Sequence, residues 1–272
     1  MSSDKEHVEH CKGVNGLDKV ILRENRRCSA EVYLYGGQVT SWKNAQGEEL
    51  LFLSSKAFFL QAAFRPPRTI RGGIPICFPQ FGNIGSLERH GFARNRIWSV
   101  DTDPPPCPSN VSHKAFVDLI LRHSEEDMKI WPHSEVRVEG LETLDYLDNL
   151  MNRERFTEQE DAITFESEVD KVYLSTPTKI AILDHERKRT FELRKDGLPD
   201  AVVWNPWDKK AKAMPDFGDD EYTNMLCVEA ACVEEPVTLK PGEEWKGRLE
   251  ISAVPSSYCS EQLDPRRLLL SG

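Results

Sequence analysis

Positive charge is scarce in this sequence of 272 residues, in which 35 Lys and Arg stand against 45 Asp and Glu, for a formal net charge of -10. Nucleic-acid binding requires a basic surface that displaces counterions, and anionic membranes attract basic segments. We therefore expect neither nucleic acid nor a membrane as a partner.

Long apolar runs are also missing. The longest apolar-rich run, Ala57–Phe64, is too short to span a bilayer. The first residues, MSSDKEHVEHCKG, contain no apolar core of the kind that a signal peptide needs. The seven cysteines are odd in number and show no repeated spacing, so we expect reduced thiols in a cytoplasmic protein.

Several common motifs are absent. The sequence has no Walker loop, no GxGxxG after a predicted strand and no GxSxG elbow. His7, His10 and Cys11 have a spacing that suits a metal, but they lie in a polar terminus that we expect to be flexible. The sequence therefore predicts neither a metal nor a cofactor.

Helical periodicity is scarce as well, and only Tyr146–Glu154 and Glu221–Met225 indicate short helices. Short runs rich in Val, Ile, Leu and aromatic residues predict strands instead. These runs are Val20–Leu22, Ala30–Tyr35, Ala115–Leu121, Val136–Val138, Ile163–Val169, Ile180–Leu183 and Ala201–Trp204. Many short strands without long alternating helices favour an all-β sandwich.

The domain organisation predicted from these patterns is simple. We expect a flexible N-terminus over residues 1–16, a single β-sandwich domain over residues 17–264 and a loose C-terminal tail over residues 265–272. Residues 237–254 predict two strands joined by a Pro-Gly turn, with Leu249, Ile251 and Ala253 on one face.

Against the acidic background, residues 68–94 concentrate positive charge. This stretch holds four arginines (Arg68, Arg71, Arg89 and Arg94), His90 and five glycines. Arginines bind planar anions through paired donors, and glycines allow backbone amides to approach a ligand closely. The stretch indicates a site for an anionic small molecule, although its glycines and prolines could equally shape a tight loop between strands.

Two carboxylates are candidates for acid–base chemistry. Glu229 lies in the apolar run NMLCVEAACV, where burial raises a carboxyl pKa and makes a usable general base. The alternative is that Glu229 lies on the exposed face of an edge strand. Asp170 follows Glu166 and Glu168 at a period of two, which favours a solvated acidic face.

The segment VVWNPWDKK adds two aromatic candidates. Trp204 and Trp207 could stack on a sugar ring, and a role in capping the core is at least as consistent with this pattern.

Five segments, taken in order, resemble the glucose-6-phosphate 1-epimerases of the aldose 1-epimerase (galactose mutarotase-like) superfamily. The segments are RGGIPICFPQFG, RHGFARN, GLPDAVVWNPW, MLCVEAA and LKPGEEWKGRL. The resemblance is strongest to plant members and covers Leu17 to Pro265. It implies a large antiparallel β-sandwich that interconverts the α and β anomers of a hexose 6-phosphate without a cofactor, and we expect a monomer.

The resemblance also implies roles for individual residues. Mutarotation needs a base for the proton of the C1 hydroxyl and an acid for the ring oxygen. By the resemblance, Glu229 is the catalytic base and Asp170 binds a sugar hydroxyl. The implied substrate-binding residues of the cationic stretch are Arg71, Arg94, Arg89 (where the family often has Gln) and His90.

The acid of the family is missing from this chain. In the family it is a histidine in a Tyr-His-Thr-Tyr motif, which should follow the segment Trp131–Ser134. Here Ser134 runs directly into Glu135, and no histidine stands in such a motif. A block that includes central strands is therefore absent, while Phe59–Phe64 resembles an insertion. Because a positioned acid contributes about 10²- to 10⁴-fold in rate, we expect impaired activity.

Two other functions remain open at this point. The first is a non-catalytic protein that binds sugar phosphates. The second is a glycosidase that uses Asp170 and Glu229 as a carboxylate pair.

Overall fold

The computed structural model describes residues 7–24, 27–56, 64, 66–102, 115–122, 124, 145–157, 166–184 and 187–255. The chain forms two compact units. The first comprises residues 1–136 and 207–225, and the second comprises residues 137–206 and 226–272. All strand pairs among the described residues are antiparallel.

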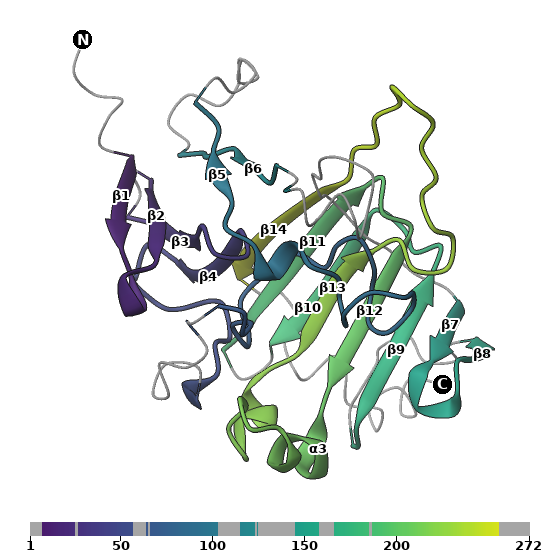
Figure 1. The fold of residues 1–272 in the computed structure, drawn as a ribbon. Coiled ribbons are helices and arrows are strands. Elements are labelled where there is room, and N and C mark those ends of the chain that lie inside the picture. Colours follow the sequence, from purple (N-terminus) through teal and green to yellow (C-terminus); the bar gives the residue numbers. More distant parts are fainter. Residues whose placement is uncertain are drawn as a thin grey trace. The chain divides into compact units, whose positions relative to one another are not determined.

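The first unit is built on a four-stranded meander, which is purple in Figure 1. The strands follow one another in space as in sequence: β1 (Val8–Lys12), β2 (Asp18–Arg23), β3 (Ser29–Tyr33) and β4 (Gln38–Lys43). The short strands β5 (Ser99–Val100) and β6 (Leu119–Ile120) form a separate pair. One apolar cluster of this unit contains Tyr33, Phe64 and Ile70, and another contains Ala93, Trp98 and Leu121.

The segment Trp207–Met225 also belongs to the first unit. It contains helix α3 (Trp207–Ala213) and the 3₁₀ turn η4 (Glu221–Asn224). In the sequence, this segment stands between two strands of the second unit, so each of its ends continues directly into that unit (Figure 1).

The second unit contains two sheets that pack face to face. The five-stranded sheet has the order β13 (Cys227–Ala231), β12 (Asp200–Asn205), β9 (Val169–Leu174), β7 (Asp145–Asp148) and β8 (Glu154–Thr157). The other sheet has the order β10 (Lys179–Asp184), β11 (Arg189–Asp196) and β14 (Arg248–Pro255). A shared core of Tyr173, Ala201, Val203 and Leu193 joins them, as expected for a sandwich.

The all-β fold class predicted from the sequence is confirmed. The runs at Val20–Leu22, Ile180–Leu183 and Ala201–Trp204 lie within β2, β10 and β12. The run at Ala30–Tyr35 lies mostly within β3, and that at Ala115–Leu121 forms only the two residues of β6. The run at Val136–Val138 and the Trp131–Ser134 junction lie outside the described residues, as does the C-terminal tail.

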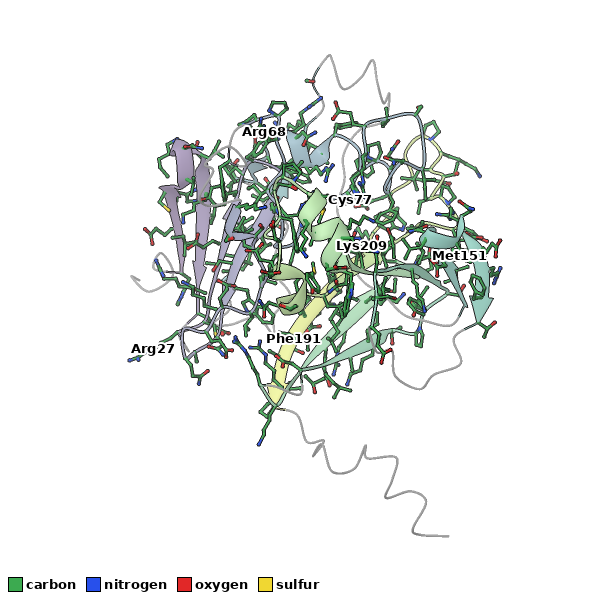
Figure 2. All side chains as sticks on the ribbon, turned by 90° about the horizontal axis from the view of Figure 1, so that it is seen from below. Arg27, Arg68, Cys77, Met151, Phe191 and Lys209 are labelled. Carbon is green, nitrogen blue, oxygen red and sulfur yellow. The ribbon has the colours of Figure 1, made fainter. Side chains whose placement is uncertain are left out.

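The short helix predicted at Tyr146–Glu154 is wrong, because this stretch forms the hairpin of β7 and β8. A 3₁₀ turn, η3 (Asn149–Met151), joins the strands, and Asn152 and Arg153 adopt positive φ values of 55° and 64°. Two successive left-handed residues reverse the chain and cannot continue a helix. Figure 2 shows Met151 at this end of the five-stranded sheet.

Two further expectations need correction. Residues 8–12, predicted to be flexible, form β1, in which alternation directs His10 and Cys11 to opposite faces. Of the two strands predicted over residues 237–254, only the second forms, as β14, with Leu249 and Ile251 in the core. Among the described residues, no helix is long and apolar enough to cross a membrane.

Candidate functional site

The structure brings Arg71, Arg89, Arg94 and His90 together in the first unit. Arg94 lies in the 3₁₀ turn η2 (Ala93–Asn95), directly after Arg89 and His90. All three arginines lie close enough to His90 to disfavour its protonation electrostatically. We call these four residues the cationic cluster. Arg68 is exposed, and its backbone carbonyl accepts a hydrogen bond from the Tyr35 hydroxyl.

His90 is a neutral residue among positive charges. Burial, followed by the charges of Arg94, Arg89 and Arg71, lowers the pKa of His90 from 6.5 to about 4. The backbone N–H of Gly82 donates to His90 Nδ1 at 3.2 Å, which places the ring proton on Nε2. At neutral pH, His90 therefore offers one hydrogen-bond donor without adding a charge.

Arg94 is a half-buried arginine of the cluster. Burial, followed by the charges of Arg71 and Arg89, lowers its pKa, while Cys77 and Glu88 act in the opposite direction. Its Nη2 donates to the backbone carbonyl of Arg89 at 2.7 Å. Its Nε is buried without a hydrogen-bond partner among the described residues, which leaves a donor for a ligand. Figure 2 labels Cys77, which lies in the same segment.

Arg71 is held by Asp216 from the Trp207–Met225 segment. Its Nε donates to Oδ2 at 3.0 Å and its Nη2 donates to Oδ1 at 3.3 Å. Such a paired, charge-assisted contact fixes the orientation of the guanidinium. Next to Arg71 the backbone requires glycine, because Gly72 has a φ of 106° and a Cβ there would lie 2.5 Å from the carbonyl oxygen of Phe52.

The loop that carries Arg89 and His90 is held by Gln80. Its Nε2 donates to the carbonyls of Gly82 and Leu87 at 3.2 Å each, and its Oε1 accepts from the Leu87 N–H at 2.9 Å. Three bonds from one side chain fix the loop without any regular secondary structure.

In the second unit, Glu229 and Asp170 lie on one face of the five-stranded sheet. Glu229 on β13 is paired with Val202 on β12, which is paired with Val172 on β9. Cys227 is likewise in register with Trp204, and Trp204 with Asp170. Paired residues and residues two apart share a face, so both carboxylates point away from the core that joins the two sheets.

Each carboxylate has a neighbour that contacts it. Asn149 Nδ2 donates to Asp170 Oδ1 at 2.7 Å. The thiol of Cys227 lies 3.1 Å from Glu229 Oε1 and donates to it. Both carboxylates are half-buried. These contacts fix the carboxylates in direction.

The local interpretations of the two carboxylates are thereby refined. Glu229 does lie on the outermost described strand of its sheet, but it is half-buried and not fully exposed. The solvated acidic face predicted for Asp170 is wrong, because β9 begins at Val169 and Glu166 and Glu168 precede the strand. The period of two therefore does not extend to them.

The register sets the spacing of the carboxylates. Glu229 and Asp170 lie two strands apart and are offset by two residues, which corresponds to roughly 12 Å between their Cα atoms. Trp204, between the two positions on β12, is suited to pack against a sugar, whereas Trp207 packs on Tyr222 at 5.3 Å in the first unit.

Three contact residues were not found from the sequence: Asp216, Asn149 and Cys227. Asp216 is 145 residues from Arg71 in the chain, and Asn149 is 21 residues from Asp170, so no local spacing connects them. Cys227 is two residues before Glu229, and strand alternation would have placed the two side chains on one face. No group of three or more potential metal ligands occurs among the residues that the structure describes.

Comparison with known proteins agrees with this architecture. The sequence model of the aldose 1-epimerase family matches residues 18–134 and 127–252. A candidate glucose-6-phosphate 1-epimerase from Cenchrus ciliaris is 62% identical over 96% of this chain and 92% of its own length. A candidate enzyme of the same name from Escherichia coli is 29% identical over 80% of this chain and 84% of its own length.

The alignment with the Cenchrus relative also shows a difference in length. It spans 309 positions, whereas this chain has 272 residues, so at least 37 positions of the Cenchrus relative have no counterpart here. The two stretches matched by the family meet at residues 127–134, beside the predicted junction at Ser134.

Solved structures confirm the fold. A candidate mutarotase from Salmonella typhimurium superimposes with a TM-score of 0.79, at 22% identity over 94% of this chain and 96% of that chain. A galactose mutarotase related enzyme from Lactobacillus acidophilus gives a TM-score of 0.58, at 17% identity over 89% and 98% of the two chains. The fold is thus of the galactose mutarotase type, and the protein is a member of the aldose 1-epimerase family.

Proposed function

We propose that this protein interconverts the α and β anomers of a hexose 6-phosphate, as the names of its relatives indicate for them. The observation that carries the proposal is the cationic cluster, in which three arginines act on a neutral histidine within an acidic chain. Arginine donors match the geometry and charge of a phosphate group.

The proposed roles follow from the chemistry of ring opening. Glu229 removes the proton of the C1 hydroxyl, the C1–O5 bond breaks, and a proton is delivered to O5. The free aldehyde rotates and the ring closes on its other face. Asp170, fixed by Asn149, accepts a hydrogen bond from a sugar hydroxyl. Arg71, Arg89, Arg94 and the Nε2–H of His90 hold the anionic part of the substrate.

The proposed site lacks the family's histidine, which protonates O5. The missing positions relative to the Cenchrus protein and the junction at residues 127–134 support the loss of the histidine-bearing block. Within the described residues of the second unit there is no histidine. We therefore propose that the chain lacks the positioned acid of the family, with a rate about 10²- to 10⁴-fold below that of a relative with the acid.

Exchange spectroscopy of α- and β-glucose 6-phosphate tests the proposal. We expect exchange that is faster than the uncatalysed background, slower than that of the Cenchrus relative, and lost in Glu229→Gln. If the wild type exchanged the anomers as fast as the Cenchrus relative, the proposed loss of the acid would be wrong.

The missing positions also favour a second candidate, a protein that binds sugar phosphates without turnover. It predicts thermal stabilisation by glucose 6-phosphate, nearly unchanged in Glu229→Gln, with exchange at the background rate. A glycosidase would leave Arg71 and Arg94 without an anion to bind, so the cationic cluster does not favour that function. We also propose a cytoplasmic monomer, in keeping with the reduced state of the cysteines that the structure describes.

A further inference from the structure

The paired contact between Arg71 and Asp216 leaves only part of the guanidinium for a ligand. Asp216 occupies the Nε–Nη2 edge of Arg71. The Nη1 group and the second hydrogen of Nη2 remain at the opposite edge. The side chains of both residues are about one-third exposed, at 35% and 31%, so the pair stands at the surface of the cluster and not beneath it.

The segment that carries Asp216 is fastened to the first unit at two further points. Glu221 accepts hydrogen bonds from the Ser54 hydroxyl at 2.8 Å and from the Ser55 N–H at 2.7 Å. Lys56 Nζ lies 2.8 Å from Asp219. Ser54 is fully buried, at 0% exposure. Asp216 is therefore presented to Arg71 from a segment whose own position is fixed.

The positive charge of Arg71 acts electrostatically on His90 and Arg94. It contributes to the lowered pKa of both His90 and Arg94. An unheld arginine in this environment would turn away from its positive neighbours, because like charges repel and the side chain has several rotatable bonds. The carboxylate of Asp216 opposes this movement.

We propose that Asp216 is a positioning residue of the anion site, which holds Arg71 so that its Nη1 edge meets the phosphate of the substrate. This inference rests on the proposed function. It extends the site to a residue of the Trp207–Met225 segment, whose continuation is the strand β13 that carries Glu229.

Calorimetric titration of the full-length protein with inorganic phosphate tests this role. We expect Asp216→Asn to bind phosphate about tenfold more weakly, and Asp216→Glu, which keeps the charge but moves it, to bind more weakly than the wild type. Arg71→Ala should weaken binding at least as much. The double variant Arg71→Ala/Asp216→Asn should equal Arg71→Ala, because Asp216 acts only through Arg71.

Asp220→Asn is the matched control, since Asp220 lies on the same segment, is exposed and makes no side-chain cap bond to η4. It should bind phosphate like the wild type. Tighter or unchanged binding by Asp216→Asn would overturn the inference, because removing a negative charge alone strengthens anion binding. So would additive losses in the double variant, or no binding by the wild type. If the variants bind phosphate as predicted but the protein does not exchange the anomers, only the proposed function would be refuted.

Discussion

At the scale of single residues, the cationic cluster combines charge with a neutral donor. Three protonated arginines already attract a dianion, and a fourth charge on His90 would be costly in their company. Burial and the arginines keep the imidazole neutral, and the Gly82 N–H fixes its tautomer. In the proposed anion site, His90 therefore supplies a directed hydrogen bond and the arginines supply electrostatic attraction.

We predict that His90 stays neutral in the folded protein until about pH 4, against an ordinary value of 6.5. Because the folded pKa is depressed, its contribution to stability is complete above about pH 6.5 and is lost as the pH falls towards 4. Titration of the imidazole nitrogens by NMR measures this directly. Arg94→Gln should raise the pKa of His90 while burial keeps it below 6.5. A wild-type midpoint near 6.5 would contradict the description.

The residue types of the cluster could be predicted from the sequence, but their partners could not. Arg71, Arg89, Arg94 and His90 stand out because they interrupt an acidic chain. Asp216 is one of many acidic residues, and only the folded chain distinguishes it by bringing it to Arg71 across 145 residues.

At the scale of elements, the Trp207–Met225 segment depends on Glu221. Burial opposes ionisation of this carboxylate, but hydrogen bonds from Ser55, Ser54 and Gly218 outweigh it and lower its pKa. A carboxylate that accepts several donors is stabilised in its charged form.

We predict that Glu221→Gln lowers the free energy of unfolding by about 1 to 3 kcal/mol at pH 7, because an amide cannot accept all of these bonds. The folded pKa is lowered, so the wild-type advantage is present above the ordinary glutamate pKa of 4.5 and shrinks as the pH falls below it. Urea unfolding at pH 7 and pH 4 measures both. The control is Glu250→Gln, whose side chain is 58% exposed and should have little effect. Equal stability of Glu221→Gln and the wild type at pH 7 would be inconsistent with this role.

Strands with clear alternation could be predicted from the sequence, and the errors arose where the chain turns. Tyr146, Leu147, Leu150 and Met151 have helical spacing, yet the left-handed residues Asn152 and Arg153 fold the stretch into a hairpin. The helix α3 was missed because it has only seven residues and follows Asn205-Pro206, which indicates a turn.

At the scale of the whole molecule, the chain contains both groups of candidate site residues that the family resemblance implies. The cationic cluster lies in the first unit, and Glu229 and Asp170 share one sheet face in the second. The family and fold could be predicted from the order of five segments.

The most direct test of the central claim is the anomer-exchange rate of this chain before and after the missing block of the Cenchrus relative is inserted between Ser134 and Glu135. We predict that insertion raises exchange of glucose 6-phosphate by about 10²- to 10⁴-fold, and that Glu229→Gln abolishes the gain. In the proposed site, the base and the binding residues are intact and only the acid is missing. An unchanged rate in the folded, extended protein would contradict this proposal, and so would a gain that survives Glu229→Gln.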